Sequence, residues 1–254
     1  MKTDYRIAIP TFKRSEAIKN KTFKFLEKTN INFSHIDIFV SDKEEVDLYK
    51  ESLKNYDVNI IGSVIGVGKN RNFIVDYYPV GQKVFGLDDD IDSITMKVDS
   101  KHIQEIQDLD NFINTAFDIT IKNKLNLWGI YPVNNPYFMK NNVSFSLKYI
   151  AAGCYGWINN KEDKAYCSLE DKEDFERSIK YYLADNGVVR FNYISMQTVY
   201  YGTSGGMQVT RTKQRIIDSA NYLIKKYPYL CKGFISKSRG VKEVRLRDTR
   251  LKRK

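Results

Sequence analysis

Three consecutive aspartates directly after a short apolar run are the feature that most constrains how this chain can fold. The run Val84–Leu87 reads V-F-G-L, which is typical of a buried strand, and Asp88, Asp89 and Asp90 follow it without a spacer. Adjacent carboxylates repel one another, and the end of a buried strand offers them little water. A divalent cation offsets this cost because hard ions take oxygen ligands. The segment therefore predicts a metal site, with an acidic surface turn as the alternative.

Short apolar runs alternate with amphipathic segments along the chain, which is typical of an α/β fold. We expect the first three strands to be parallel, with right-handed crossovers. No repeat or linker divides the sequence, so it is interpreted as one domain over residues 1–254. Strands are expected over 5–10, 36–40, 58–61, 83–87, 127–131, 143–149, 188–194 and 241–246, and the longer helices over about 15–28, 108–122, 169–185 and 210–227.

Charge bears on the partners of the chain more than on its fold. The net charge is +10, and the basic tail over residues 237–254 holds nine Lys or Arg against two acidic residues. Such a tail favours a polyanion, with nucleic acid first, and the alternative is a solvated terminus. No apolar run approaches the roughly 20 residues that span a bilayer, so no membrane contact is expected. The three cysteines are expected to be buried thiols in a cytoplasmic protein without an export signal.

A glycine-containing loop before a short helix is a candidate phosphate site. Gly66 and Gly68 permit a tight loop, and the helix that follows offers free N–H groups and the positive end of its dipole. Lys69 and Arg71 add positive charge. The spacing is not that of a P-loop, because Asn70 stands where Ser or Thr is required. The alternative is a helix-opening loop without a ligand.

Taken together, three segments resemble the GT-A fold of nucleotide-sugar glycosyltransferases. They are I-P-T-F-K-R at 9–14, G-x-G-x-x-R-N at 66–72 and L-D-D-D at 87–90. The resemblance implies a Rossmann-like mixed sheet with helices on both faces and a nucleoside diphosphate-sugar as donor. It also implies Mn²⁺ or Mg²⁺ held by Asp88 and Asp90. The implied donor-binding residues are Pro10, Thr11, Lys13, Arg14, Gly68, Lys69, Arg71, Asn72, Asp88 and Asp89.

An acidic helix start in the second half of the chain adds a candidate catalytic base. Carboxylates at such a position are often only partners of the helix dipole. In inverting GT-A enzymes, however, a Glu-Asp pair in this part of the chain resembles the site of the general base. The resemblance therefore implies Glu173 and Asp174 as catalytic residues, with Asp174 as the base. Glu170 and Asp171 are the competing register.

Two further segments are candidates for contact with the donor. Ala151–Trp157 combines small residues, which would let a sugar approach the backbone, with Trp157 as a stacking platform. The alternative there is a close crossing of strands. Tyr201–Gln208 is rich in glycine and long enough to order over a bound diphosphate, and an ordinary surface loop is the alternative.

Within the GT-A group, four segments resemble the phage and TET-associated glycosyltransferases. These are I-P-T-F-K-R, L-D-D-D-I, E-D-F-E-R-S and G-G-M-Q. The resemblance implies transfer of a sugar from a UDP-sugar to a hydroxymethylated pyrimidine in DNA, in the host cytoplasm of a phage-infected cell. One departure is that His35 and His102 both precede the region where many GT-A enzymes supply a late metal ligand. The alternatives are a transferase acting on a polysaccharide or glycan, and a non-catalytic nucleic-acid-binding module.

Overall fold

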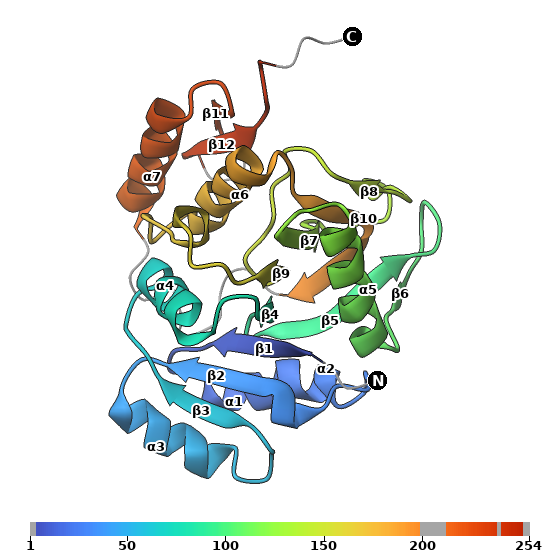
Figure 1. Cartoon of the computed structure of the whole chain (residues 1–254), viewed down its shortest axis with the longest axis vertical. Coiled ribbons are helices and arrows are strands. Elements are labelled where there is room, and N and C mark those ends of the chain that lie inside the picture. The colour runs from blue at the N-terminus through green and yellow to red at the C-terminus, as the bar shows by residue number, and fades with distance from the viewer. Residues whose placement is uncertain (1–3, 199–211, 238–239, 251–254) are drawn as a thin grey trace.

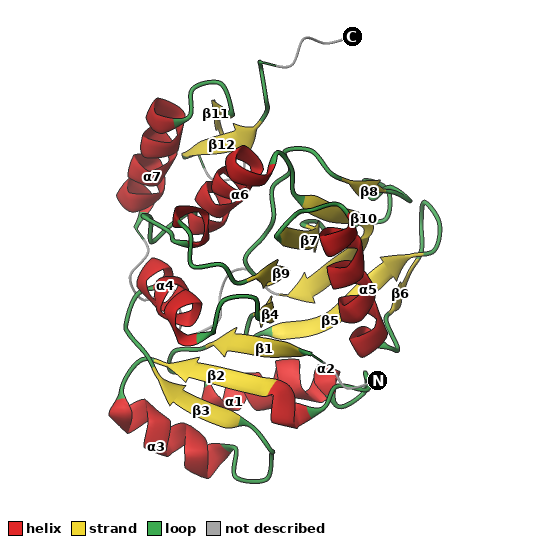
Figure 2. Cartoon of the chain, viewed as in Figure 1, coloured by secondary structure: helices red, strands yellow, loops and turns green. Residues whose placement is uncertain are grey.

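The structure of the protein is a computed structural model that describes residues 4–198, 212–237 and 240–250. A central sheet carries helices on both faces, as the sequence predicted (Figures 1 and 2). Within the described residues, this sheet has ten strands in the order β3-β2-β1-β4-β9-β7-β10-β5-β6, with β8 paired to β10. Its strands are β1 (Tyr5–Pro10), β2 (Ile36–Val40), β3 (Asn59–Gly62), β4 (Lys83–Leu87), β5 (Ile91–Lys97), β6 (Ile103–Glu105), β7 (Leu127–Tyr131), β8 (Val143–Ser144), β9 (Cys154–Ile158) and β10 (Val189–Thr198).

The helices form two packed layers against this sheet, each with its own hydrophobic cluster. One cluster joins the first helical segment, α3 and α5 to one face, and the other joins α4, α6 and α7 to the opposite face. The bounds are α1 (Ser15–Ile18), which continues through a π-helical turn η1 (Lys19–Phe23) into α2 (Lys24–Leu26), α3 (Lys43–Ser52), α4 (Val67–Tyr77), α5 (Leu109–Lys122), α6 (Glu173–Asp185) and α7 (Lys213–Lys226), with short 3₁₀ turns η2 (Phe33–His35) and η3 (Asp163–Ala165).

The first half of the sheet is parallel, as predicted. β1 pairs in parallel with β2 and with β4, and β2 pairs in parallel with β3. The second half is mixed, because β9 runs antiparallel to both β4 and β7, and β10 is parallel to β7 but antiparallel to β5. The carboxyl ends of β1 and β4 therefore lie side by side, where an α/β sheet ordinarily holds its ligand.

Several predicted boundaries were wrong in the second half of the chain. The strand expected over 143–149 is limited to β8, because only Val143 and Ser144 find partners on β10. Tyr149 instead packs on Phe175 of α6, with ring centroids 4.2 Å apart. Strand β5 begins at Ile91, directly after the aspartates, where an acidic surface turn was the alternative to a metal site. Tertiary pairing thus overrides local propensity at these positions.

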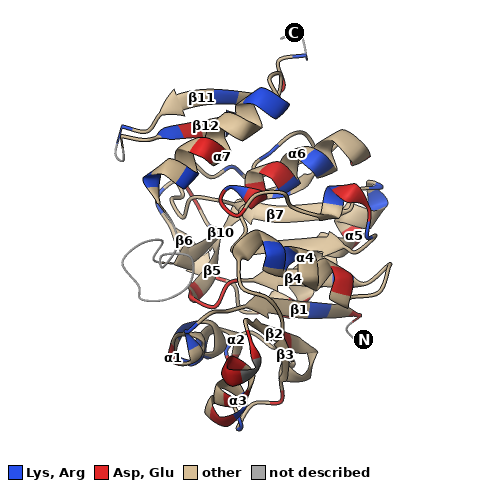
Figure 3. Ribbon diagram, turned by 90° about the vertical axis from the view of Figure 1, so that its left-hand side faces the viewer, with Lys and Arg blue, Asp and Glu red and all other residues tan. Residues whose placement is uncertain are grey.

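The C-terminal residues form a small unit packed against α6. The predicted strand over 241–246 exists as β12 (Lys242–Leu246), but it pairs with β11 (Cys231–Ile235) in a separate two-stranded sheet beside α7. Lys and Arg lie on β11, β12 and α7 at this end of the molecule (Figure 3). Much of the predicted basic tail is therefore folded structure, and residues 251–254 lie outside the described residues. That the chain is one domain stays a prediction.

Two expectations from composition can be compared with the structure directly. Cys154, Cys167 and Cys231 are all buried and free, as predicted. Among the helices that the structure describes, none is both long and apolar enough to cross a membrane.

Candidate functional site

The aspartate triplet lies in a tight connection between β4 and β5, held at both ends by hydrogen bonds. The Asp88 amide donates to the carbonyl of Gly153 at 3.0 Å. The Thr22 hydroxyl donates to the carbonyl of Asp88 at 2.9 Å and accepts from the amide of Ile91 at 3.0 Å. Thr22 belongs to the π-helical turn η1, a kind of distortion often found at functional sites. The backbone of the triplet is thus fixed before any ligand binds.

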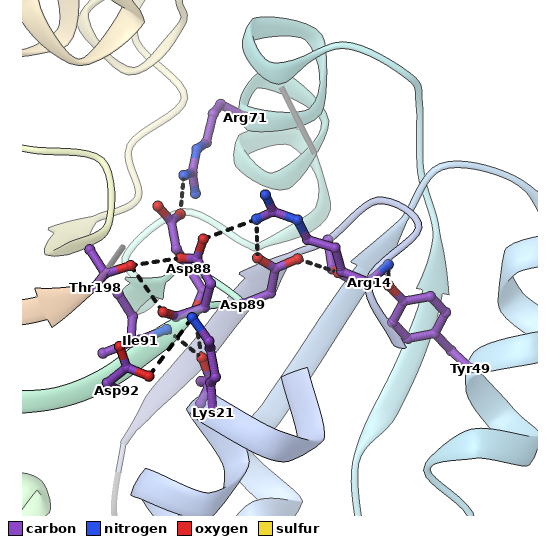
Figure 4. A network of polar contacts seen from close by, with 12 residues as sticks. Arg14, Lys21, Tyr49, Arg71, Asp88, Asp89, Ile91, Asp92 and Thr198 are labelled. Atoms are coloured by element: carbon purple, nitrogen blue, oxygen red, sulfur yellow. Dashed lines mark hydrogen bonds and ion pairs between the residues drawn. The ribbon is translucent and has the colours of Figure 1, made fainter. Parts of the chain in front are cut away.

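The three aspartate side chains have different surroundings (Figure 4). Asp89 is 5% exposed and accepts hydrogen bonds from the Thr11 hydroxyl at 2.5 Å and from Arg14 Nη1 at 3.1 Å. Asp88 accepts from Arg71 Nη2 at 3.0 Å, and its side chain is 37% exposed. Burial raises the pKa of Asp89 to about 6, although Arg14 and Thr11 act in the opposite direction. Asp89 is therefore the structural member of the triplet.

Asp90 completes the acidic site from the other side of Asp89. Its carboxylate accepts from Arg14 Nη1 at 3.0 Å and from the Thr198 hydroxyl at 3.2 Å. Burial raises the pKa of Asp90, and the negative charge of Asp88 raises it further. A bound cation would relieve both effects.

Asp88 and Asp90 fit a divalent metal as two oxygen ligands, but they do not form a complete protein cage. Among the described residues, no group of three His, Cys, Asp or Glu is placed to hold a metal ion. Mg²⁺ commonly binds through one or two carboxylates together with water and substrate phosphates. The donor set therefore suits a metal that arrives with, or is completed by, a diphosphate.

The loop after β1 is tied to both the triplet and α3. Thr11 is 5% exposed and shares a 2.7 Å hydrogen bond with the Tyr49 hydroxyl, which also accepts from the Arg14 amide. The Lys13 amide donates to Glu45 Oε1 at 2.6 Å, and Lys13 has a φ of 55°. Thr11 and Arg14 thus contact the aspartates, and Pro10 and Lys13 belong to the same segment. The contact of all four with a nucleotide stays a prediction.

The start of α4 already has an anionic partner from within the chain. The Glu170 carboxylate accepts from the amides of Gly68 at 3.1 Å and Lys69 at 3.3 Å. A Cβ at Gly66 or Gly68 would lie 3.5 Å or less from this carboxylate. The free N–H groups predicted for a phosphate are therefore occupied, and a phosphate bound there would have to displace Glu170.

Arg71 and Asn72 have separate tasks in the structure. Arg71 is 7% exposed and donates to Asp88 and to the carbonyl of Ala152 at 3.4 Å. The Asn72 side chain donates to the carbonyl of Cys167 at 2.9 Å and accepts from its amide at 2.7 Å. Asn72 therefore fixes the segment that leads to α6, a role that the sequence did not suggest. Arg71 contacts the acidic site, and its role in donor binding stays a prediction.

Asp174 lies at the start of α6, where its carboxylate is held and half-buried. The Tyr149 hydroxyl donates to Asp174 Oδ2 at 2.5 Å, and the Phe175 amide donates to Oδ1 at 2.9 Å. Both oxygens of the carboxylate are thus held by hydrogen-bond donors, which fixes the orientation that a general base would need.

Glu173 is more deeply placed than its neighbour. It is 4% exposed, and burial raises its pKa to about 7, with the charge of Asp174 adding to the rise. The nearby guanidinium groups of Arg71 and Arg177 lower it. Arg71, which donates to Asp88, and Arg177 of α6 both lie over the ring of Tyr155, so α6 borders the acidic site.

A buried arginine beside this pair lacks partners in the described part of the chain. Arg177 stacks on the ring of Tyr155 at 3.7 Å, and none of its three guanidinium nitrogens finds a hydrogen-bond partner among the described residues. A cavity of about 10 Å³ adjoins it, roughly the room that one water molecule needs. An ordered water is the simplest partner for so buried a charge.

Glu170 and Asp171, the alternative candidates for the catalytic base, both form structural contacts. Glu170 caps α4, and Asp171 is 1% exposed and pairs with Arg215 of the C-terminal unit at 2.9 Å. Asp174 is the more accessible acidic group in this segment. The geometry therefore favours Asp174 over Asp171, although the assignment of the base stays a prediction.

Trp157 does not lie where a sugar could stack on it, so that prediction was wrong. Its side chain is 3% exposed and stacks on Tyr155 with centroids 5.2 Å apart. The small residues in this segment serve a close crossing, because a Cβ at Gly156 would lie 2.2 Å from the Trp128 ring. The glycine-rich segment Tyr201–Gln208 lies outside the described residues.

The sequence did not single out several residues of the site. Thr22, Tyr149 and Thr198 each donate a hydroxyl hydrogen bond to the acidic residues or their backbone. They come from three distant segments, and none stands in a recognisable motif. Only the fold brings them to the carboxylates.

Comparison with known proteins bears on the fold. No protein-family model matches the chain, and no curated protein matches it in sequence. The structure of S. aureus TarS 1-349 in complex with UDP-GlcNAc has a TM-score of 0.56 at 17% identity, over 87% of this chain and 66% of that chain. A mannosyltransferase from Pyrobaculum calidifontis in complex with GDP-Man and Mn²⁺ has a TM-score of 0.57 at 9% identity, over 87% and 64%.

A mycobacterial protein also matches, with a TM-score of 0.55 at 8% identity, over 96% of this chain and 84% of that chain. The chain spans less than two thirds of the TarS and mannosyltransferase structures. At these identities the likeness shows a shared fold. The predicted GT-A fold class is therefore confirmed.

Proposed function

We propose that this protein is a metal-dependent glycosyltransferase that moves a sugar from a nucleoside diphosphate, with UDP-sugar as the first candidate, to a hydroxymethylated pyrimidine in DNA. One observation carries the proposal: two partly exposed carboxylates, Asp88 and Asp90, stand at the carboxyl end of β4, and a third, Asp174, stands at the neighbouring start of α6. In a GT-A fold, this arrangement supports a metal site at Asp88 and Asp90 and a base at Asp174 that would act on one reaction centre.

In donor binding, the carboxylates and the arginines of the site would have different roles. Asp88 and Asp90 would hold Mn²⁺ or Mg²⁺, which neutralises charge on the departing diphosphate. Arg71 and Arg14 keep these carboxylates in place through hydrogen bonds of 3.0 Å. The solved structures with UDP-GlcNAc and with GDP-Man and Mn²⁺ support a donor of this class, since they share the fold.

The transfer step assigned to Asp174 is a single displacement at the sugar. The acceptor hydroxyl oxygen forms a bond to the anomeric carbon, the bond from that carbon to the diphosphate oxygen breaks, and the hydroxyl proton passes to an Asp174 oxygen. The hydrogen bond from Tyr149 keeps the carboxylate oriented. General-base assistance of this kind contributes roughly 10²–10⁴-fold.

DNA is proposed as the acceptor because of charge and its placement. The net charge is +10, and Lys and Arg lie along β11, β12 and α7, in the unit packed against α6. Such a surface suits a phosphate backbone. A glycan acceptor is the second candidate, since it requires the same donor site without the basic surface.

Two measurements test the proposal in sequence. Thermal shift with UDP, GDP and no nucleotide, each with and without Mn²⁺, should show stabilisation that needs both nucleotide and metal. Transfer is then followed by mass spectrometry from a panel of UDP-sugars to DNA that contains hydroxymethylcytosine, with unmodified DNA as the control. DNA binding without any nucleotide or metal response would instead support a non-catalytic module. Donor hydrolysis without transfer to DNA would redirect the search to glycans.

A further inference from the structure

A basic pocket lies near the start of β10, away from the aspartate triplet. Its volume is about 260 Å³, and Lys140, Lys148 and Arg190 line it. Pockets that enclose a whole drug-sized ligand usually measure roughly 300–1,000 Å³. This pocket therefore suits one group of a larger ligand. The polar side chains of Asn142 and Asn192 complete its lining and hydrogen-bond to each other at 2.8 Å.

The three cations of this pocket are not balanced by acidic groups. Across the described residues, no carboxylate forms an ion pair with Lys140, Lys148 or Arg190. Burial lowers the pKa of Lys148, and the charges of Arg190 and Lys140 lower it further. Like charges that are held together in a pocket repel one another, and a bound anion would offset this repulsion.

Arg190 is held in place so that its position does not depend on a ligand. Its Nε donates to Asn192 Oδ1 at 2.8 Å, and its Nη1 contacts the carbonyl of Tyr149 at 3.4 Å. The guanidinium also lies over the ring of Tyr131 at 5.1 Å. A fixed guanidinium is the group best suited to phosphate oxygens.

Exposed aromatic side chains lie at the edge of the same pocket. Phe138 lines it and is 54% exposed, and the adjacent Tyr137 is 75% exposed. Their rings meet edge to face at 5.1 Å. Cations beside exposed aromatic rings are typical of surfaces that bind single-stranded nucleic acid, where phosphates meet Lys or Arg and bases stack on the rings.

The pocket is connected to the candidate base through one residue. The backbone carbonyl of Tyr149 contacts Arg190, while its side-chain hydroxyl donates to Asp174. A ligand in the pocket would thus lie one residue away from the group that receives the acceptor proton. The lining of the pocket includes none of Asp88, Asp89 and Asp90, so a ligand bound there would leave the acidic site free for the donor.

We propose that this pocket binds a backbone phosphate of the DNA acceptor strand close to the reacting nucleotide, with Tyr137 and Phe138 as stacking surfaces for a neighbouring base. The inference rests on the proposed function for its acceptor, and it adds the residues that position the strand. Lys140, Lys148 and Arg190 are positioning residues, since they hold the acceptor and not the reacting atoms.

The test compares variants of equal charge in the full-length protein. Lys140→Gln with Lys148→Gln removes two charges from the pocket. Lys28→Gln with Lys50→Gln removes two from exposed positions on and beside other helices. The probe is a short fluorescein-labelled single strand containing hydroxymethylcytosine, and anisotropy is recorded over a series of salt concentrations. The pocket variant should raise Kd roughly tenfold and flatten the salt slope by about 0.7 for each lost phosphate contact.

An aromatic variant separates stacking from charge. Phe138→Ala should weaken binding roughly fivefold or more while the salt slope stays that of the wild type, because stacking releases no counterions. The thermal shift with UDP and Mn²⁺ shows in each variant that the protein is folded. A loss that is the same in the pocket variant and in the Lys28/Lys50 variant would overturn the proposal.

Failure of this inference can be told from failure of the proposed function. If sugar transfer to DNA occurs and the pocket variant keeps the wild-type Kd and KM for the strand, the pocket does not hold the acceptor. If the wild type binds UDP with Mn²⁺ but no DNA, the DNA acceptor and this inference both fall, and the donor site stands. Loss of heparin binding without loss of DNA binding in the pocket variant would assign the pocket to a glycan and overturn the proposal.

Discussion

Side chains of opposite charge gather at the two ends of strand β10, and the two clusters differ in whether neighbouring side chains neutralise them. At its carboxyl end, the Thr198 hydroxyl donates to Asp90, and Arg14 and Arg71 bind the neighbouring carboxylates. Near its amino end, Arg190 lies with two lysines in a pocket where no described carboxylate balances them. Within the part of the chain that the structure describes, the charges are compensated at one end and not at the other.

This difference shows which part of each site is complete without a ligand. At the acidic end, the arginines fix the direction of each carboxylate, so the proposed metal would meet an arranged set of oxygen atoms. At the basic end, hydrogen bonds fix Arg190, but the excess positive charge remains. We expect the acidic end to be sensitive to the loss of any member, and the basic end to tolerate the loss of a cation until an anionic ligand is added.

The largest effect is expected at the acidic end. Asp90→Asn keeps the size of the side chain and an oxygen near Thr198 but removes the charge of one of the two proposed metal ligands. Metal-dependent transfer should fall by about 10³-fold, which corresponds to roughly 4 kcal/mol of transition-state stabilisation. Initial rates over a Mn²⁺ titration measure this. Asp92→Asn is the matched control and should stay near wild type, since the ion pair that Asp92 forms among the described residues is a long one, with Lys21 at 3.8 Å.

The second effect is a pH dependence of stability that comes from Glu173. The folded protein keeps the Glu173 proton up to a pKa of about 7, whereas the ordinary value is 4.5. The unfolded chain therefore loses its proton first, and the free energy of unfolding should fall by up to about 3 kcal/mol as pH rises from about 4.5 to 7. Glu173→Gln should remove this fall. Urea denaturation of both proteins at pH 5 and pH 8 measures it, and equal pH slopes would contradict the assignment.

Between the two ends, Asp174→Asn tests the base. It preserves size and the contact with Tyr149 but removes the basicity, so transfer should fall by roughly 10²-fold or more. The thermal shift with UDP and Mn²⁺ should not change. Asp163→Asn is a suitable control because Asp163 is 94% exposed, whereas Asp171→Asn would mainly break a buried ion pair with Arg215. Normal transfer by Asp174→Asn would exclude this base and favour a retaining mechanism.

The smallest effects come from removing one cation at each end. Arg14→Met leaves the buried Asp89 with the Thr11 hydrogen bond alone, and should lower the free energy of unfolding by about 1–3 kcal/mol. Lys148→Met relieves repulsion from Arg190 and Lys140, and should change the free energy of unfolding by no more than about 0.5 kcal/mol. Urea denaturation without ligand gives both values. Similar losses at the two ends would mean that the compared sites are equally compensated.

The sequence predicted the parallel half of the sheet closely, because local signals suffice there. The strands over 5–10, 36–40 and 83–87 match β1, β2 and β4 residue for residue, since each is a buried run bounded by proline or polar residues. The mixed half was predicted less well. Its strands depend on partners far away in the sequence, as for β5, which pairs with β10.

The candidate site likewise has residues that the sequence predicted and residues that it did not. The aspartates, Arg14 and Arg71 could be found from short motifs, and the structure brings them together. The capping of α4 by Glu170 could not be found, because the two segments lie 102 positions apart. Nor could the clamp of Asn72 on Cys167, which uses the very side chain that a motif assigns to the donor.

The attachment of the C-terminal unit to α6 has a consequence for the order of events during protein synthesis. Lys172 pairs with Glu243, and the Tyr182 hydroxyl donates to Asp248, so the helix that carries Asp174 takes partners from near the end of the chain. The first of these pairs spans 71 positions, which a ribosome needs several seconds to add at about 5–20 residues per second. Until then α6 lacks these partners. In a nascent chain, the segment around Asp174 would thus reach its final set of contacts well after α6 itself has been synthesised.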